Sequence, residues 1–116
     1  MRYFVHMETL DGVRNNASYN EFIEALDAIK YATKHVYAIA RLFDETGDMI
    51  AEMVGHELRR PTYIVVNGNT GNNLTKKNYR DAATNSAMRW RQTLRALDIP
   101  VYVMNSLTGE IVYEAL

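Results

Sequence analysis

Residues 36–53 read VYAIARLFDETGDMIAEM, which is two apolar runs joined by a polar turn that ends in Thr46, Gly47 and Asp48. A related stretch closes the chain, because residues 101–114 read VYVMNSLTGEIVYE, with Thr108 and Gly109 between the two apolar runs. Paired apolar runs around a Gly-containing turn are typical of β-hairpins. Each stretch follows a segment with helical periodicity, so the chain is predicted to use one strand-helix-hairpin unit twice.

The segments before the two hairpins supply the other elements of each unit. Residues 3–7 and 62–66 are short apolar runs and are predicted to be strands. Ser18 and Glu21 have the spacing of a capping box, and a helix with an apolar stripe is predicted from there to about His35. A second helix is predicted from about Lys76 to Leu97, with Thr75 as its N-cap.

The expected fold class is α+β, with two strand-helix-hairpin (β-α-β-β) units at about 1–58 and 61–116. Right-handed crossovers would place both helices on one face of a single mixed sheet of about six strands. Arg59-Arg60-Pro61 is the plausible boundary between the halves and is too short for a flexible linker. One fused domain is therefore expected over residues 1–116.

Composition narrows the functional classes. The chain has no cysteine, which excludes disulfides, thiolate metal sites and a thiol nucleophile. The N-terminal MRYFVHMETLDG carries charges where a signal peptide needs an apolar core, and no apolar run approaches the roughly 20 residues that span a bilayer. A cytoplasmic protein without a membrane partner is expected. The formal net charge of -1 is unlike the basic total of most nucleic-acid-binding proteins.

The predicted strands are apolar on both sides, although the two helices would cover only one face of the sheet. A bare apolar face of that size is unusual in a monomer, so a homodimer through this face is predicted. The predicted interface residues are Tyr3, Tyr37, Ile39, Tyr102 and Met104. The alternatives are helices on opposite faces, or a sheet that curls until its far face is internal.

The loop over residues 67–77 is a candidate anion or nucleotide site, because it is predicted to run from a strand into a helix N-terminus. Its candidate residues are Gly68, Gly71, Thr75, Lys76 and Lys77. The loop lacks both the P-loop order and the dinucleotide-binding glycine spacing. An ordinary polar connection is the alternative.

The second predicted helix carries a basic stripe formed by Arg80, Arg91 and Arg95. Such a stripe beside tyrosines can contact phosphates and stack bases, so nucleic-acid binding is an alternative function. The stripe could equally be a solvated face, or the counterpart of an acidic surface such as Glu21, Glu24 and Asp27 on a partner.

No metal site, cofactor or catalytic residue is predicted. His6, His35 and His56 lack the spacing of metal ligands, and the acidic turn at residues 44–48 is shorter than a calcium-binding loop. Neither a nucleophile elbow nor an evident acid/base pair is present, so an enzyme is the weaker hypothesis. The expected function is a small cytoplasmic macromolecular interaction module that forms a homodimer and can bind a further protein.

Overall fold

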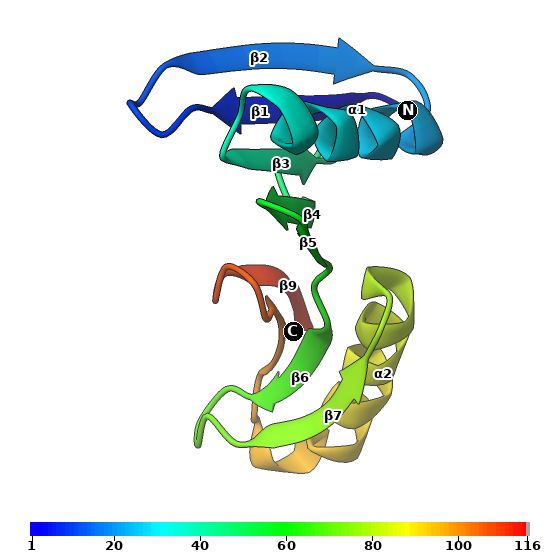
Figure 1. Cartoon of the computed structure of the whole chain (residues 1–116). Coiled ribbons are helices and arrows are strands. Elements are labelled where there is room, and N and C mark those ends of the chain that lie inside the picture. The colour runs from blue at the N-terminus through cyan, green and yellow to red at the C-terminus, as the bar shows by residue number, and fades with distance from the viewer. Residues whose placement is uncertain (116) are drawn as a thin grey trace. The chain divides into compact units, whose positions relative to one another are not determined.

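The computed structural model describes residues 1–115, and their contacts divide the chain into two compact units, one ending at Arg60 and one beginning at Pro61. The first unit contains β1 (Tyr3–Glu8), β2 (Arg14–Tyr19), α1 (Phe22–His35), β3 (Ile39–Phe43), β4 (Met49–Val54) and β5 (Glu57–Arg59). The second contains β6 (Tyr63–Asn67), β7 (Asn73–Lys77), α2 (Arg80–Thr93), the 3-10 helix η1 (Arg95–Leu97), β8 (Val101–Asn105) and β9 (Ile111–Ala115). In each unit one helix lies against one sheet (Figure 1).

Both sheets are antiparallel throughout. The strand order is β2-β1-β3-β4-β5 in the first sheet and β7-β6-β8-β9 in the second. The predicted α+β class is confirmed, but the prediction of one mixed sheet of about six strands is wrong. Each unit is a ββαββ arrangement, and β5 extends the first sheet at its β4 edge.

Two edge strands, β2 and β7, explain this correction. Their sequences, RNNASY and NLTKK, are mostly exposed and rich in residues that disfavour strands. They become strands because they pair with the apolar β1 and β6. Each one reverses the chain before the helix, so β3 and β8 return antiparallel to β1 and β6, and no parallel crossover forms.

The same two strands displace the predicted helix caps. Ser18 lies in β2, where its Oγ accepts a hydrogen bond of 2.9 Å from Arg2 Nη2, and Thr75 lies in β7. The residues at the N-cap positions are Glu21 and Tyr79, and neither makes a side-chain capping bond. The predicted caps are therefore wrong, whereas α1 ends at His35 as predicted.

The central strands and the helices of the two units match in strand register and in helix length. Val5 pairs with Leu42 in the first unit, and Val65 pairs with Val103 in the second. Both helices have 14 residues and bury their fourth and eighth residues, which are Ala25 and Ile29 in α1 and Ala83 and Ala87 in α2. The expected reuse of one unit is thus seen as a shared topology that includes the two edge strands.

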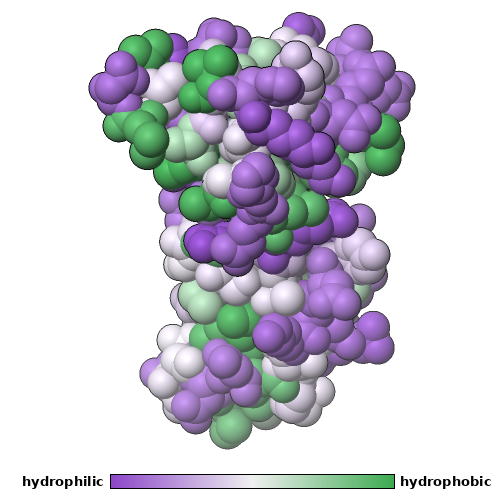
Figure 2. Space-filling view, viewed as in Figure 1, coloured by the Kyte–Doolittle hydropathy of each residue, from purple (hydrophilic) through white to green (hydrophobic). Residues whose placement is uncertain are grey.

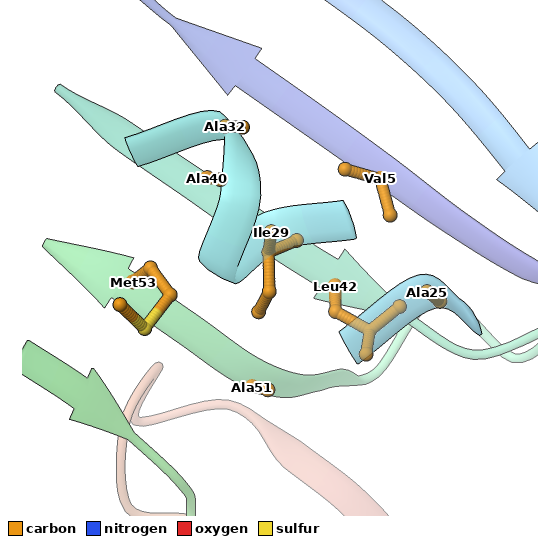
Figure 3. Packing of buried hydrophobic residues seen from close by; sticks show 8 residues of the cluster. All are labelled: Val5, Ala25, Ile29, Ala32, Ala40, Leu42, Ala51 and Met53. Carbon is orange, nitrogen blue, oxygen red and sulfur yellow. The ribbon is translucent and has the colours of Figure 1, made fainter. Parts of the chain in front are cut away.

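Each core lies between the helix and the face of the sheet that it covers. Figure 3 shows Ile29 of α1 among the buried side chains of the first unit, which are Val5, Ala25, Ala32, Ala40, Leu42, Ala51 and Met53. The second core is formed by Tyr63, Val65, Ala83, Ala87, Val101, Val103 and Ala115. Because side chains alternate along a strand, the residues between these core positions point to the opposite face of each sheet.

Candidate functional site

The face of the second sheet opposite α2 carries two rows of side chains, which are set by the strand register. One row reads Lys76, Ile64, Met104 and Ile111, and the other reads Asn73, Val66, Tyr102 and Glu114. We call these eight residues the second-sheet face. Its apolar members are half-buried except Ile111, which is 52% exposed, and its three polar members are exposed. An apolar centre with polar residues around it is the usual anatomy of a protein interface.

The equivalent face of the first sheet has a different character, because an ion-pair network crosses it. Arg41 Nε lies 2.9 Å from Glu52 Oε2, and Arg59 Nη1 lies 3.9 Å from Glu52 Oε1. A hydrogen bond to the Glu57 carboxylate raises the pKa of Arg59. By register, Arg41 stands where the second unit has Tyr102. The apolar centre is therefore a property of the second sheet, although hydrophobic residues reach the surface in both units (Figure 2).

The five residues predicted for the interface fall in three places. Tyr102 and Met104 lie on the second-sheet face, and Ile39 lies on the face of the first sheet opposite α1. Tyr3 points toward α1, where its ring makes an edge contact with Phe22 at 5.8 Å. Tyr37 packs against the same core, so neither tyrosine belongs to an open face. Alternation misplaced Tyr37 because β3 begins only at Ile39.

The candidate anion loop is a hairpin loop between β6 and β7, and α2 begins only at Arg80. Thr75, Lys76 and Lys77 lie in β7, so the helix N-terminus on which this prediction rests is elsewhere. Gly68 has a packing role, because a Cβ there would lie 2.6 Å from the Tyr102 ring and 2.7 Å from the Pro100 carbonyl oxygen. Gly71 has a positive φ of 77°, as the turn requires. Anion binding by this loop stays a prediction.

The three arginines of the candidate nucleic-acid stripe do not form one exposed row. Arg91 is largely buried, and its Nη2 lies 3.3 Å from Asp98 Oδ1. Its Nε and Nη1 are buried and lack a hydrogen-bond partner among residues 1–115. Arg80 is half-buried, and Arg95 is exposed in η1. The structure does bring Arg91 and Arg95 together, because both line a cavity of about 300 Å³ beside Tyr113.

A feature that the sequence did not reveal is a groove of about 410 Å³ along α1, lined in part by Tyr19, Tyr31 and Tyr37. Part of the groove could have been predicted from the sequence, because the spacing of Ala28, Tyr31 and His35 places these residues along one side of a helix. Tyr19 could not be added to that set, because its strand was itself not predicted.

Among residues 1–115, no group of three or more histidine or carboxylate side chains is arranged to hold a metal ion. None of the helices in this part of the chain combines the length and apolar character needed to cross a membrane. Comparisons of the chain with protein-family models, with curated proteins and with solved structures found no match.

Proposed function

We propose that the protein is a cytoplasmic macromolecular interaction module, and not an enzyme, and that its second-sheet face binds a second copy of the chain to form a homodimer. One observation carries the proposal. Five apolar side chains form an unbroken patch across β6, β8 and β9 of the second sheet, and they are Ile64, Val66, Tyr102, Met104 and Ile111. Burying such a patch against a partner is favourable by about 25 cal/mol for each Å² of apolar surface.

The charges of the face favour a second copy as the occupant. Lys76 on β7 and Glu114 on β9 occupy diagonally opposite corners of the two rows. A face-to-face pair related by a two-fold axis can therefore place Lys76 near the partner subunit's Glu114, and the symmetry repeats this contact. The strands of the two sheets then cross obliquely.

The size of the face sets the expected affinity. Strands about 4.8 Å apart that rise about 3.3 Å per residue give this sheet a footprint of roughly 300 Å². Stable complexes bury roughly 800 Å² per partner, so this dimer is expected to be weak and concentration-dependent.

Sedimentation equilibrium of the full chain between about 10 and 500 µM tests the proposal. The average mass is expected to rise from one chain toward two. Ile111→Lys should abolish the rise, whereas Leu97→Lys, at a site 70% exposed in η1 and outside the face, should leave it unchanged. A wild-type mass of one chain throughout this range would overturn the homodimer, as would equal effects of the two variants.

A charge exchange tests the diagonal arrangement. Lys76→Glu and Glu114→Lys should each weaken the dimer, because each single variant places like charges near one another across the two-fold axis. The double variant should restore it. A double variant weaker than both single variants would contradict the proposed face-to-face geometry.

A further inference from the structure

A groove runs along α1 on the side of the helix that faces β2. It has a volume of about 410 Å³. Its polar and aromatic lining residues are Tyr19, Glu24, Asp27, Tyr31, His35 and Tyr37. We call it the tyrosine groove. Met7, Ala28 and Ala32 also line it and give it an apolar wall.

Its aromatic walls are held in place by contacts within the first unit. The Tyr31 ring lies against the His35 ring, with centroids 4.1 Å apart. The hydroxyl of Tyr37 accepts a hydrogen bond of 3.2 Å from Asn15 Nδ2 on β2. Tyr19 is half-buried at the end of β2, where it pairs with Tyr3. The rings are thus supported by a helix, a strand and the segment before β3.

The carboxylates in the tyrosine groove are Glu24 and Asp27, and its histidine, His35, lies against the Tyr31 ring. Glu24 and Asp27 lie one helical turn apart on α1, and neither carboxylate makes a hydrogen bond or ion pair among residues 1–115. The lining includes neither lysine nor arginine. Aromatic faces and carboxylates both attract cations, so the two kinds of side chain favour the same ligand.

The second unit repeats the groove with the opposite charge. A cavity of about 300 Å³ lies along α2 and is lined by Lys77, Ser86, Arg89, Trp90 and Thr93. By register and helix position, these residues correspond to Tyr19, Ala28, Tyr31, Ala32 and His35 of the first unit. The groove is therefore a product of the shared fold, whereas its charge is set by the side chains of each unit.

We propose that the tyrosine groove binds an alkylammonium group, contributed either by a lysine side chain of a protein partner or by a free polyamine. The ammonium group would lie against the tyrosine rings and near Glu24 and Asp27, where cation–π and charge attraction act together. The aliphatic stem would pack along Met7, Ala28 and Ala32, as lysine stems do on apolar surfaces. The site lies in the first unit, outside the second-sheet face, so it adds a second binding activity to the proposed homodimer.

NMR titration of the isotope-labelled full chain with Nα-acetyl-lysine methylamide and with spermidine tests this proposal. The neutral analogue Nα-acetyl-norleucine methylamide, which keeps the four-carbon aliphatic stem but lacks the ammonium group, serves as the control ligand. Saturable shifts are expected at Tyr19, Tyr31 and Tyr37 with a Kd of about 1 mM or tighter, and none at Arg89 or Trp90. A preference for the lysine derivative would identify a protein ligand, and a preference for spermidine would identify a free polyamine; either supports the site.

Matched variants separate recognition from folding. Tyr31→Leu changes a side chain that is 67% exposed, and it should weaken binding about three- to fivefold. Tyr79→Leu, at a tyrosine 69% exposed in the second unit, should have no effect. The double variant Glu24→Gln with Asp27→Asn should remove the preference for the amine over the neutral analogue. The proposal is overturned by the absence of saturable shifts up to about 10 mM of either amine. Equal shifts with the neutral ligand, or equal effects of the two tyrosine variants, would overturn it as well.

Discussion

Asp44 and Asn105 make the same hydrogen bond in the two units, because the Oδ1 atom of each accepts from the backbone amide two residues later at 2.9 Å. The donors are the amides of Thr46 and Leu107, and both accepting side chains are buried. In each loop a glycine with positive φ follows, Gly47 at 85° and Gly109 at 72°. One turn chemistry therefore closes the second hairpin of both units.

Asn105→Ala should destabilise the protein by about 1 to 3 kcal/mol, because a buried amide that orders the turn is lost and the Leu107 amide loses its acceptor. The free energy of unfolding in urea measures this change. Thr108→Ala is the control in the same loop, since Thr108 Oγ1 accepts only an exposed amide bond of 3.2 Å from Glu110. If both variants lower the free energy of unfolding by the same amount, the Asn105 side chain does not order the hairpin.

Ile29→Ala should lower the free energy of unfolding by about 2 to 5 kcal/mol, because it opens a cavity in a fully buried part of the first core. Ile23→Ala changes the same side chain on the same helix at a position that is 64% exposed. Ile23→Ala should lower the free energy of unfolding by less than about 1 kcal/mol. Equal losses in thermal or urea unfolding would show that α1 is oriented differently on its sheet.

Gly68→Ala should destabilise the second unit by about 1 to 3 kcal/mol, because its Cβ would collide with Tyr102 and with the Pro100 carbonyl group. The same collision should break the 2.8 Å bond from the Gly68 amide to Pro100 O. Hydrogen exchange at residue 68 should accelerate in the variant. Asn69→Ala, at an exposed position in the same loop, should change neither stability nor exchange. Unchanged protection in Gly68→Ala would argue against the close approach of the two segments.

A hydrogen bond donated by the Thr9 hydroxyl holds the pKa of Asp11 below its ordinary value. Thr9→Val should therefore raise the pKa of Asp11, which a carboxyl NMR titration measures directly. Because the pKa is lower in the folded state than in the unfolded chain, the ionised carboxylate stabilises the fold above the ordinary pKa of 3.8. This contribution is lost as the pH falls through the folded-state value. An unchanged Asp11 titration in Thr9→Val would refute the assigned cause.

Two turns and one helix end that neighbouring residues determine were predicted, whereas the edge strands, and with them the helix starts, depend on distant pairing and were not. The turns at Gly47 and Gly109 and the end of α1 at His35 follow from neighbouring residues, and the structure contains all three. β2 and β7 are polar at the sequence level and are strands only because β1 and β6 lie beside them. Missing one edge strand in each unit reversed the predicted direction of the hairpin strands relative to β1 and β6, so a mixed sheet was predicted where the structure has antiparallel sheets.

The candidate site, like the fold, could be predicted only where a local sequence pattern determines it. Alternation along a strand was enough to place Tyr102 and Met104 together on one face. It could not reveal that Arg41 and Glu52 cross the equivalent face of the first unit, because their ion pair joins two strands. It also could not reveal the burial of Arg91 beside β9, which depends on how α2 lies on its sheet.

The most direct test of the homodimer is an isotope-filtered NOE experiment on a mixture of labelled and unlabelled full-length chains at high concentration. The proposed face-to-face geometry predicts NOEs between chains from the methyl groups of Ile64 and Val66 to the ring of the partner subunit's Tyr102. It would be contradicted if no NOE between chains joined these groups at any concentration reached, or if all such NOEs arose from residues outside the second-sheet face.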